Sequence, residues 1–357
     1  IKVVYQPKFT ITNTILKQIA LIEACKEVID HAPLIPAYER RFREDAMVRI
    51  VHHGTHIEGN KLGLEEAEKV LSGQPITARE RDIQEVMNYR KVVEFIEESR
   101  IKKGALREQE LRINEALIKK IHALTVYKIL SSDKVGEYRN TQVVVRSNQT
   151  GEVTFRPPAA DRVAQHMKDF IAWIKNEDAK DIHPVLKAGI VHYELVRIHP
   201  FVDGNGRVAR AISMLVLFQE DYDIRRFFSL EEYFDSDPEN YYSSLQSVEK
   251  GKGDLTEWLS YFSRGLAIEL SKIKEKIQKL SVDAAIKEKL GGQIALTDRQ
   301  ITIIEYLQKA GFLQNKAFPS LFPMVSEDTI LRELKDLIKK KIIKRIGKTK
   351  AARYVMR

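Results

Sequence analysis

Apolar residues recur at three- and four-residue spacing along most of this 357-residue chain. This spacing is typical of amphipathic α-helices. The segments that show it, and that we predict to be helices, are 15–29, 40–52, 64–71, 80–99, 106–124, 161–175, 184–198, 206–220 and about 255–280. Between them, residues 142–146 and 152–156 alternate apolar and polar side chains, which predicts a β-hairpin. The sequence therefore predicts a mainly α fold with one hairpin near its centre.

Composition excludes several classes of protein. Cys25 is the only cysteine, so neither an intramolecular disulfide nor a cysteine zinc cluster can form, which favours a reducing, cytoplasmic location. No run of about 18 apolar residues is present that could span a membrane. The first ten residues lack the apolar core of a signal peptide. Because the chain begins at Ile1 and not at Met, we expect its numbering to start inside a longer polypeptide.

Positive charge is concentrated at the C-terminal end. Residues 297–357 contain 14 Lys and Arg against six Asp and Glu, whereas the rest of the chain is nearly neutral, with 45 against 44. The elements predicted here are helices at 298–309, 316–322 and 326–340 and strands at 342–346 and 353–356. This order resembles a winged-helix domain. Residues 282–295 contain a Gly-Gly pair and lack periodicity, so they are the predicted linker.

A winged-helix domain with this charge would bind DNA, mainly through phosphate contacts. Ser326 would cap the recognition helix. The cations offered to phosphates would be Arg332, Lys335, Lys339 and Lys340 on this helix and Lys348, Lys350 and Arg353 on the wing. The alternative is a protein-interaction module with a solvated basic face, because this fold is often reused.

The most informative segment is the loop HPFVDGNGRVAR at residues 199–210, between two predicted helices. Its glycines, Gly204 and Gly206, allow backbone N–H groups to converge without interference from side chains. The loop opens onto a helix N-terminus, where the helix dipole favours anions. Arg207 and Arg210 in the first turn oppose that dipole, by about 0.3–1 kcal/mol each, unless an anion is bound. The loop therefore predicts an anion-binding site.

The same loop contains groups that could act on a bound polyphosphate. Two arginines with a ring of N–H groups suit phosphate oxygens. Asp203 supplies a hard oxygen ligand for Mg²⁺, which would bridge phosphates. His199, at the start of the loop, can act near neutral pH as a general base. Base, metal ligand and anion site together predict phosphoryl or nucleotidyl transfer.

This loop resembles the signature of the Fic family of nucleotidyltransferases, H-P-F-x-D/E-G-N-G-R-x-x-R, at all nine specified positions. The resemblance covers roughly residues 110–250. It includes His122, the sequence GEYR at 136–139, the predicted hairpin and the two prolines that follow the hairpin. The two glycines of the loop resemble those of the branch that transfers AMP, whereas relatives that transfer phosphate carry Ala and Lys there.

The resemblance implies a reaction and a role for each loop residue. Members use Mg²⁺ and ATP to transfer AMP to a Tyr, Thr or Ser hydroxyl of a target protein, with release of pyrophosphate. On this chain His199 would deprotonate the hydroxyl and Asp203 would hold Mg²⁺. The residues that would bind ATP are Gly204, Asn205 and Gly206 around the phosphates, Arg207 beside them and Arg210 at the γ-phosphate. The target would dock on the hairpin 142–156 by main-chain pairing.

A second motif, GTHIEGN at residues 54–60, resembles the Fic inhibitory motif S/T-x-x-x-E-G/N. There the Glu, here Glu58, pairs with the second arginine of the signature, here Arg210, and blocks productive placement of the γ-phosphate. Gly59 would end a helix and place Glu58 at its C-terminus, where a carboxylate is slightly unfavourable unless a cation pairs with it. The position four before Glu58 is Gly54 instead of Ser or Thr. The resemblance implies low basal activity and, as a minor alternative, de-AMPylation through a water oriented by Glu58.

The chemical candidates also have simpler structural explanations. Asp203 could only cap the following helix, and the two glycines could form a plain tight turn. The arginines could only make surface ion pairs. Glu58 could be a solvated charge, and the hairpin could lie on the surface without a partner.

Four further histidines are interpreted as structural. His52, His53 and His56 could suggest metal ligation, but no carboxylate or cysteine partner completes a set, so surface or core histidines are favoured. His192 shares a helix face with His199 and is interpreted as a buried structural histidine instead of a ligand.

We predict three parts: residues 1–110 as an N-terminal helical region with the inhibitory motif, 111–285 as the Fic catalytic core with the following long helix, and 286–357 as the winged-helix domain. The predicted function is a protein adenylyltransferase that Glu58 inhibits. The alternative is a DNA-binding transcriptional regulator whose Fic pocket senses nucleotide. The target protein, the modified hydroxyl and the oligomeric state, with a homodimer as one option, are left open.

Overall fold

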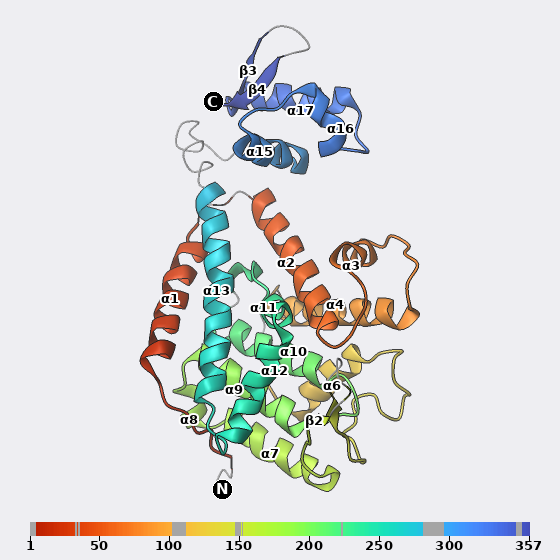
Figure 1. Ribbon diagram of the computed structural model, residues 1–357, viewed down its shortest axis with the longest axis vertical. Helices are drawn as coiled ribbons and strands as arrows, with labels where there is room; N and C mark the ends of the chain where they lie inside the picture. The colour runs from red at the N-terminus through yellow and green to blue at the C-terminus, as the bar shows by residue number, and fades with distance from the viewer. Residues whose placement is uncertain are drawn as a thin grey trace. The chain divides into compact units, whose positions relative to one another are not determined.

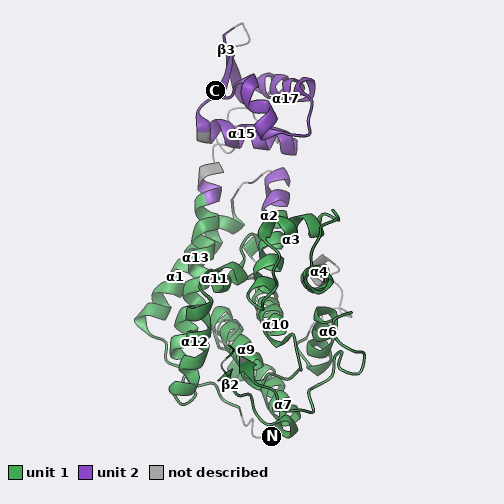
Figure 2. Ribbon diagram, turned by 45° about the vertical axis from the view of Figure 1, so that its right-hand side comes forward, with its two compact units in different colours: residues 1–31, 43–275 green, residues 32–42, 276–357 purple. Residues whose placement is uncertain are grey.

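The computed structural model describes residues 5–32, 34, 36–101, 112–146, 151, 153–222, 224–280, 296–347 and 352–357. The chain divides into two compact units (Figure 2). Unit 1 comprises residues 1–31 and 43–275, and unit 2 comprises residues 32–42 and 276–357. The predicted domain boundaries after residues 110 and 285, and the predicted linker 282–295, lie outside the described residues.

The described residues among the first 280 form helices and one short hairpin, as predicted (Figure 1). The helices are α1 (Asn13–Asp30), α2 (Pro36–His56), α3 (Leu64–Leu71), α4 (Glu80–Ile101), α6 (Glu115–Thr125), α7 (Val163–Ile174), α8 (Glu177–Lys180), α9 (Pro184–Ile198), α10 (Asn205–Gln219), α11 (Leu230–Ser236), α12 (Pro238–Lys250) and α13 (Thr256–Leu280). Short 3₁₀ turns lie at η1 (Ala160–Arg162) and η2 (Ile224–Arg226). In the hairpin, β1 (Val145–Arg146) pairs antiparallel with β2 (Val153–Phe155), over a shorter span than predicted and with an irregular register.

One of the differences from the predicted elements has a local cause. The helix expected over 106–124 begins at Glu115, because the side chain of Asn114 caps it by accepting a hydrogen bond from the N–H of Leu117 at 2.9 Å. Its predicted part before residue 112 lies outside the described residues. Helices α8, α11 and α12 were not predicted.

Helices α9 and α10 pack against each other in the interior of unit 1 and position the loop between them (Figure 1). Helix α9 is apolar on almost all sides, and nearly all of its residues are buried, as expected for a helix with neighbours all round it. The indole N–H of Trp258 on α13 donates to the carbonyl of Gly189 on α9 at 2.8 Å. The loop that follows α9 is therefore held on a rigid support.

Helix α1 runs beside α13 (Figure 1), where the Ser263 hydroxyl donates to the Gln18 side chain at 2.6 Å. The buried thiol of Cys25 lies 3.7 Å from the Ser271 hydroxyl in the same contact. Among the helices that the structure describes, none has both the length and the apolar character needed to cross a bilayer.

The C-terminal part of unit 2, described at residues 296–347 and 352–357, has three helices followed by a hairpin, in the predicted order. Its elements are α15 (Asp298–Ala310), η3 (Asn315–Ala317), α16 (Phe318–Leu321), α17 (Glu327–Lys339), β3 (Ile343–Ile346) and β4 (Arg353–Met356). β3 and β4 pair antiparallel, and Leu313 bridges to Tyr354. The predicted cap of α17 is confirmed, because the Ser326 hydroxyl accepts a hydrogen bond from the N–H of Thr329. The winged-helix assignment itself stays a prediction.

Candidate active site

The loop between α9 and α10 begins with a left-handed residue, His199, and reaches α10 through a second one, Gly204. Their φ angles are 51° and 81°, and the first costs a non-glycine residue about 1–2 kcal/mol. The Asn205 side chain holds the loop closed: its amide oxygen accepts from the Phe201 N–H at 2.8 Å, and its amide nitrogen donates to the Phe201 carbonyl at 2.9 Å. The side chain of Asn205 thus shapes the loop, and its backbone N–H lies in the first turn of α10.

His122, to which the sequence analysis gave no role, supports this loop from α6. Its ring stacks on Phe201, with centroids 3.8 Å apart and planes 2° apart. The Gly136 N–H donates to Nδ1 at 3.0 Å, so the proton lies on Nε2, which donates to the Asp203 carbonyl at 3.1 Å. Burial lowers the pKa of His122 to about 4, and the imidazole is therefore neutral at physiological pH.

Arg139 connects the segment after the hairpin to the same loop. Its Nε donates to the His199 carbonyl at 2.8 Å, and its Nη2 donates to the Pro158 carbonyl at 2.5 Å. Its backbone N–H also donates to the Pro200 carbonyl at 2.9 Å. These bonds fix the hairpin's C-terminal end relative to His199.

The His199 side chain is poised to accept a proton. Its Nδ1 lies 3.3 Å from the Val196 carbonyl, which can only accept, so Nδ1 is the donor and Nε2 keeps its lone pair. Burial lowers the pKa of His199 below its ordinary value. A neutral imidazole with a free Nε2 is what a general base requires near pH 7.

Arg207 and Arg210 are each only 2% exposed, although both carry a full charge. Arg207 contacts Asp203 at 3.2 Å and Glu85 at 3.6 Å. Arg210 donates through Nη2 to the Gly54 carbonyl at 2.7 Å and lies 2.9 Å from Oε1 of Glu58. The Nε and Nη1 atoms of both guanidinium groups find no hydrogen-bond partner in the described part of the chain. Unpaired buried donors of this kind are costly, which indicates a site prepared for an anion.

Glu58 occupies the predicted anion position. It lies just beyond the end of α2, where its N–H donates to the Thr55 carbonyl at 3.1 Å. Its carboxylate is seated directly on Gly206, so that a Cβ atom at this glycine would overlap Oε1. The first turn of α10, with its positive dipole end, thus faces the Glu58 carboxylate.

The departure from the inhibitory motif at Gly54 has a physical cause. A Cβ atom at residue 54 would overlap Cε1 of Tyr89 on α4, which is fully buried against it. The backbone of α2 can therefore approach α4 closely enough for the Gly54 carbonyl to accept from Arg210. Thr55 does not replace the missing hydroxyl, because its side chain bonds back to the carbonyls of Val51 and His52.

Asp203 is an ionised carboxylate beside the two arginines. Burial would raise its pKa, but Arg207, the Gly204 N–H and Arg81 together hold the pKa below its ordinary value. Arg81 donates to Oδ2 at 2.8 Å and the Gly204 N–H donates to Oδ1 at 2.5 Å. The side chain remains 32% exposed. One accessible carboxylate beside a phosphate site fits the manner in which Mg²⁺ is commonly held.

One cavity brings together His199, Gly206 and Glu58 with Val145 and Phe155 of the hairpin. Its wall includes three tyrosines that the sequence analysis missed, namely Tyr193 on α9 and Tyr241 and Tyr242 on α12. The lining of this cavity does not include the other predicted site residues, namely Asp203, Gly204, Asn205, Arg207 and Arg210. The signal for α12 was the Asp-Pro pair at 237–238, because Asp237 caps this helix and proline suits its first turn.

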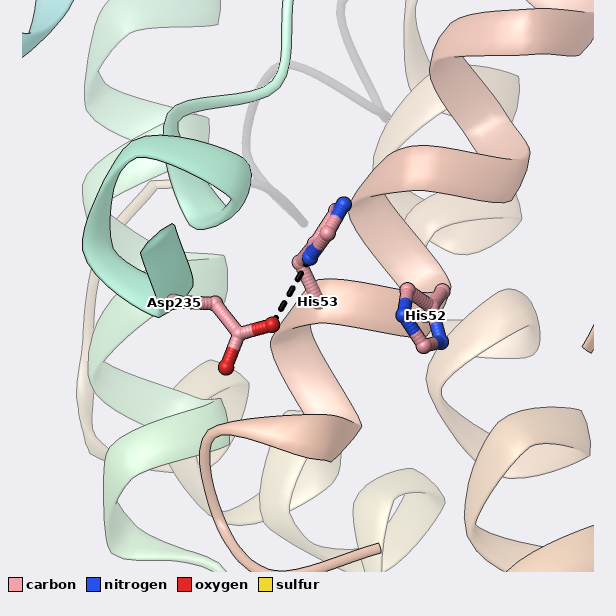
Figure 3. A group of neighbouring side chains, drawn as sticks. All are labelled: His52, His53 and Asp235. Atoms are coloured by element: carbon pink, nitrogen blue, oxygen red, sulfur yellow. Dashed lines mark hydrogen bonds and ion pairs between the residues drawn. The ribbon is translucent and has the colours of Figure 1, made fainter. Parts of the chain in front are cut away.

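The other histidines divide into two groups. His192 is completely buried with Nε2 2.8 Å from the Tyr241 hydroxyl, as expected of a structural histidine. The statement that no carboxylate accompanies His52, His53 and His56 is wrong. Asp235 of α11 lies 2.7 Å from Nδ1 of His53 (Figure 3) and 2.9 Å from Nδ1 of His56.

Comparison with known proteins gives a family match over the core of the site. Residues 112–217 match the family described as Fic/DOC. A protein adenylyltransferase fic-1 of Caenorhabditis elegans is 29% identical over 208 residues, which are 58% of this chain and 38% of the relative. A protein adenylyltransferase Fic of Drosophila grimshawi is 30% identical over 185 residues, which are 51% of this chain and 35% of the relative. The chain thus spans little more than a third of the curated relatives it matches.

Solved structures agree on the fold. A Fic family protein from Desulfovibrio desulfuricans G20 superposes with a TM-score of 0.66 at 24% identity, covering 99% of this chain and 98% of the other. Residues 134–508 of Fic-1 from C. elegans superpose with a TM-score of 0.60 at 25% identity, covering 75% of this chain and 73% of the other. The predicted mainly α fold of the Fic type is therefore confirmed.

Proposed function

We propose that this chain, which carries a Fic/DOC domain at residues 112–217, is a protein adenylyltransferase that transfers AMP from ATP to a hydroxyl side chain of a target protein. The observation that carries the proposal is the pair of buried arginines with unpaired N–H groups at the start of α10, beside the neutral imidazole of His199. The names of the relatives, protein adenylyltransferases, support the same chemistry.

In the proposed reaction the target hydroxyl attacks the α-phosphate of ATP. Nε2 of His199 accepts the hydroxyl proton, a new O–P bond forms, and pyrophosphate leaves. The backbone from Gly204 to Gly206 and the N-terminal end of α10 bind phosphate oxygens. Arg207 and Arg210 supply charge-assisted hydrogen bonds to the phosphates, with Arg210 at the γ-phosphate.

Mg²⁺ would be held by Asp203, with phosphate oxygens completing its ligands. The carboxylate fits this role because it is ionised and partly exposed. When bound, the ion neutralises charge on the phosphates. Arg81 and Arg207, which now contact the carboxylate, would share it with the ion.

The target segment would lie along the hairpin, next to His199. Val145 and Phe155 line the same cavity as the histidine, and β1 and β2 form a two-stranded sheet among the described residues. A short sheet with open edges can add an extended segment by main-chain hydrogen bonds. Such pairing accepts varied target sequences while fixing the distance between the backbone and the reacting hydroxyl.

Glu58 would inhibit the enzyme by occupying the place of phosphate oxygens. Its carboxylate pairs with Arg210 at 2.9 Å and sits on Gly206, and both residues are proposed to contact ATP. Because the side chain is 28% exposed and lies in the turn after α2, its displacement does not require the core to open. ATP bound with Glu58 in place would have its terminal phosphate held away from Arg210.

The experiment that tests the function uses ATP labelled at the α- or the γ-phosphate. The protein is the Glu58→Gly variant, alone and combined with His199→Ala. We expect label on protein from the α-position only, and a loss of about 10²–10⁴-fold with His199→Ala. Transfer of γ-label would indicate a kinase, and transfer of neither label would favour the alternative of a nucleotide-sensing regulator. His31→Ala, an exposed histidine of α1's C-cap, serves as the matched control.

DNA binding by unit 2 is the second candidate function. Arg332, Lys335 and Lys339 are exposed on α17, and Arg353 is exposed on β4. Lys340 is half-buried and pairs with Asp336 at 2.5 Å. Lys348 and Lys350 lie outside the described residues. Three exposed cations on one helix favour a phosphate-binding face.

A further inference from the structure

A cluster of three histidines and one aspartate lies at the end of α2, in the turns that lead to Glu58. His52, His53 and His56 come from α2, and Asp235 comes from α11 (Figure 3). One ligand atom each from His52, His53 and Asp235 lies within 4.8 Å of the other two. The proposed reaction uses none of these residues.

His52 lies in this cluster but is not one of the two histidines that pair with Asp235. It is 7% exposed, and its ring lies against the rings of His53 and His56, with centroids 4.6 and 5.3 Å away. An imidazole nitrogen is the commonest side-chain ligand of a transition metal, so this ring can contribute one.

The aspartate is already arranged as a ligand. Its side chain is 5% exposed, and His53 and His56 both reach it with Nδ1, at 2.7 and 2.9 Å. The carboxylate is thus bonded to two of the three imidazoles, and His52 is the third. Histidines and a carboxylate brought together in this way are the usual ligands of a transition metal.

We propose that His52, His53 and Asp235 form a binding site for a transition-metal ion of the Zn²⁺ class, with His56 orienting Asp235. Imidazole ligands select Zn²⁺ over Mg²⁺ and Ca²⁺, which prefer oxygen atoms. Zn²⁺ binds imidazole nitrogen at about 2.0–2.1 Å, so the three ligand atoms, which lie within 4.8 Å of one another, would move closer together on binding. A water molecule completes the four ligands.

The bound ion would connect α2 to α11 one turn before Glu58. The last turn of α2 sets the position of the Glu58 carboxylate on Gly206. Metal binding would therefore hold α2 in the conformation that places Glu58 against Arg210. This consequence rests on the proposed inhibitory role of Glu58, whereas the metal site itself does not.

The test is direct titration of the full chain, freed of metal, with Zn²⁺, and with Co²⁺ as a spectroscopic probe. We expect one Zn²⁺ per chain by calorimetry, visible Co²⁺ absorption of the tetrahedral type, and a higher Tm with Zn²⁺. His53→Gln and Asp235→Asn should each weaken binding at least tenfold, and His56→Gln should weaken it by about 10–100-fold as an orienting residue. His31→Gln, which alters an exposed histidine elsewhere, should leave binding unchanged.

The outcomes separate the site from its alternatives. Binding of no Zn²⁺, or equal binding by the wild type and the His53→Gln variant, would overturn the proposal and leave the cluster as a set of ion pairs. Circular dichroism of each variant shows whether it is folded, and His52→Gln supplies an independent variant if Asp235→Asn unfolds. Because the readout is metal binding, a failure here leaves the AMP-transfer proposal untouched, and the reverse also holds.

Discussion

Positive charge gathers on two helices of this chain, α10 and α17, in opposite ways. At the start of α10, Arg207 and Arg210 are buried and several of their N–H groups have no partner. Along α17, Arg332, Lys335 and Lys339 point into solvent. Buried cations gain strength from a low local dielectric and need a specific anion, whereas exposed cations are already satisfied by water.

This difference in burial determines whether a cation can recognise one specific anion. Charges in water attract any polyanion over the Debye length and lose much of that attraction in salt. Buried guanidinium groups act only on the atoms that reach them, and for Arg210 these include an oxygen of Glu58. A rigid support for such groups, provided by α9 and α10, is also what electrostatic stabilisation of a transition state requires.

The first expected effect follows from removing the Glu58 carboxylate, which now fills the buried site. Glu58→Gly frees Arg210 and the surface of Gly206, so we expect AMP incorporation to rise by about 10–100-fold, equivalent to the roughly 1.5–3 kcal/mol of a charge-assisted hydrogen bond. Self-modification with α-labelled ATP measures it. The control is Glu65→Gly, an exposed carboxylate in the first turn of α3. Equal AMP incorporation by the wild type and by Glu58→Gly would contradict the proposal that the Glu58 carboxylate inhibits transfer by filling the buried site.

The second prediction concerns the free-energy cost of protonating His122, which is buried beside the loop that precedes α10. His122 has its pKa lowered by burial to about 4, against an unfolded value of about 6.5. Between these values the unfolded chain binds a proton that the folded chain excludes, so stability falls as pH falls from 6.5 to 4, by roughly 3 kcal/mol for this group. His122→Gln should flatten this slope in urea unfolding measured across the range. The control variant is His31→Gln, which alters the C-cap histidine of α1.

The third prediction concerns the close packing of Gly54, whose carbonyl accepts from Arg210, against the Tyr89 ring. At residue 54 an added methyl group would overlap the Tyr89 ring, so Gly54→Ala should lower the free energy of unfolding by about 1–3 kcal/mol. Gly63→Ala is the matched control, because its added methyl group meets only an ordinary contact with Glu66. Combining Gly54→Ala with Tyr89→Ala should cost less than the two single changes added together. Strict additivity in this cycle would contradict the packing explanation.

Local patterns in the sequence predicted the parts of this structure that depend on neighbours along the chain. Helices α3 and α9 have the predicted bounds, because apolar periodicity and, for α9, a proline in its first turn are local signals. The grouping of the loop's glycines and arginines at the start of α10 was also predictable, since they lie within seven residues of one another.

Contacts between distant segments were not predictable from the same patterns. Asp235 reaches His53 across 182 residues, and α11, which carries it, is only two turns long and gave no periodic signal. Tyr89 excludes a side chain at Gly54 from a separate helix, so the departure from the inhibitory motif could be seen in the sequence but not explained. Spacing along a chain determines which side chains share a helix face, but only packing determines which faces meet.

The smallest expected effects belong to the exposed face of α17. Lys335→Ala and Arg332→Ala should each change the free energy of unfolding by less than about 0.5 kcal/mol, because the side chains are solvated. If this face binds DNA, each change should weaken binding to a nonspecific duplex and reduce the slope of log affinity against log salt by about one. Mobility-shift titrations at several salt concentrations measure that slope, with Lys341→Ala, an exposed cation beyond the helix end, as the control. If no α17 variant changes the slope, this face is not the phosphate contact. The cations of α17 would then differ from those of α10 in solvent exposure, but they would bind no ligand of their own.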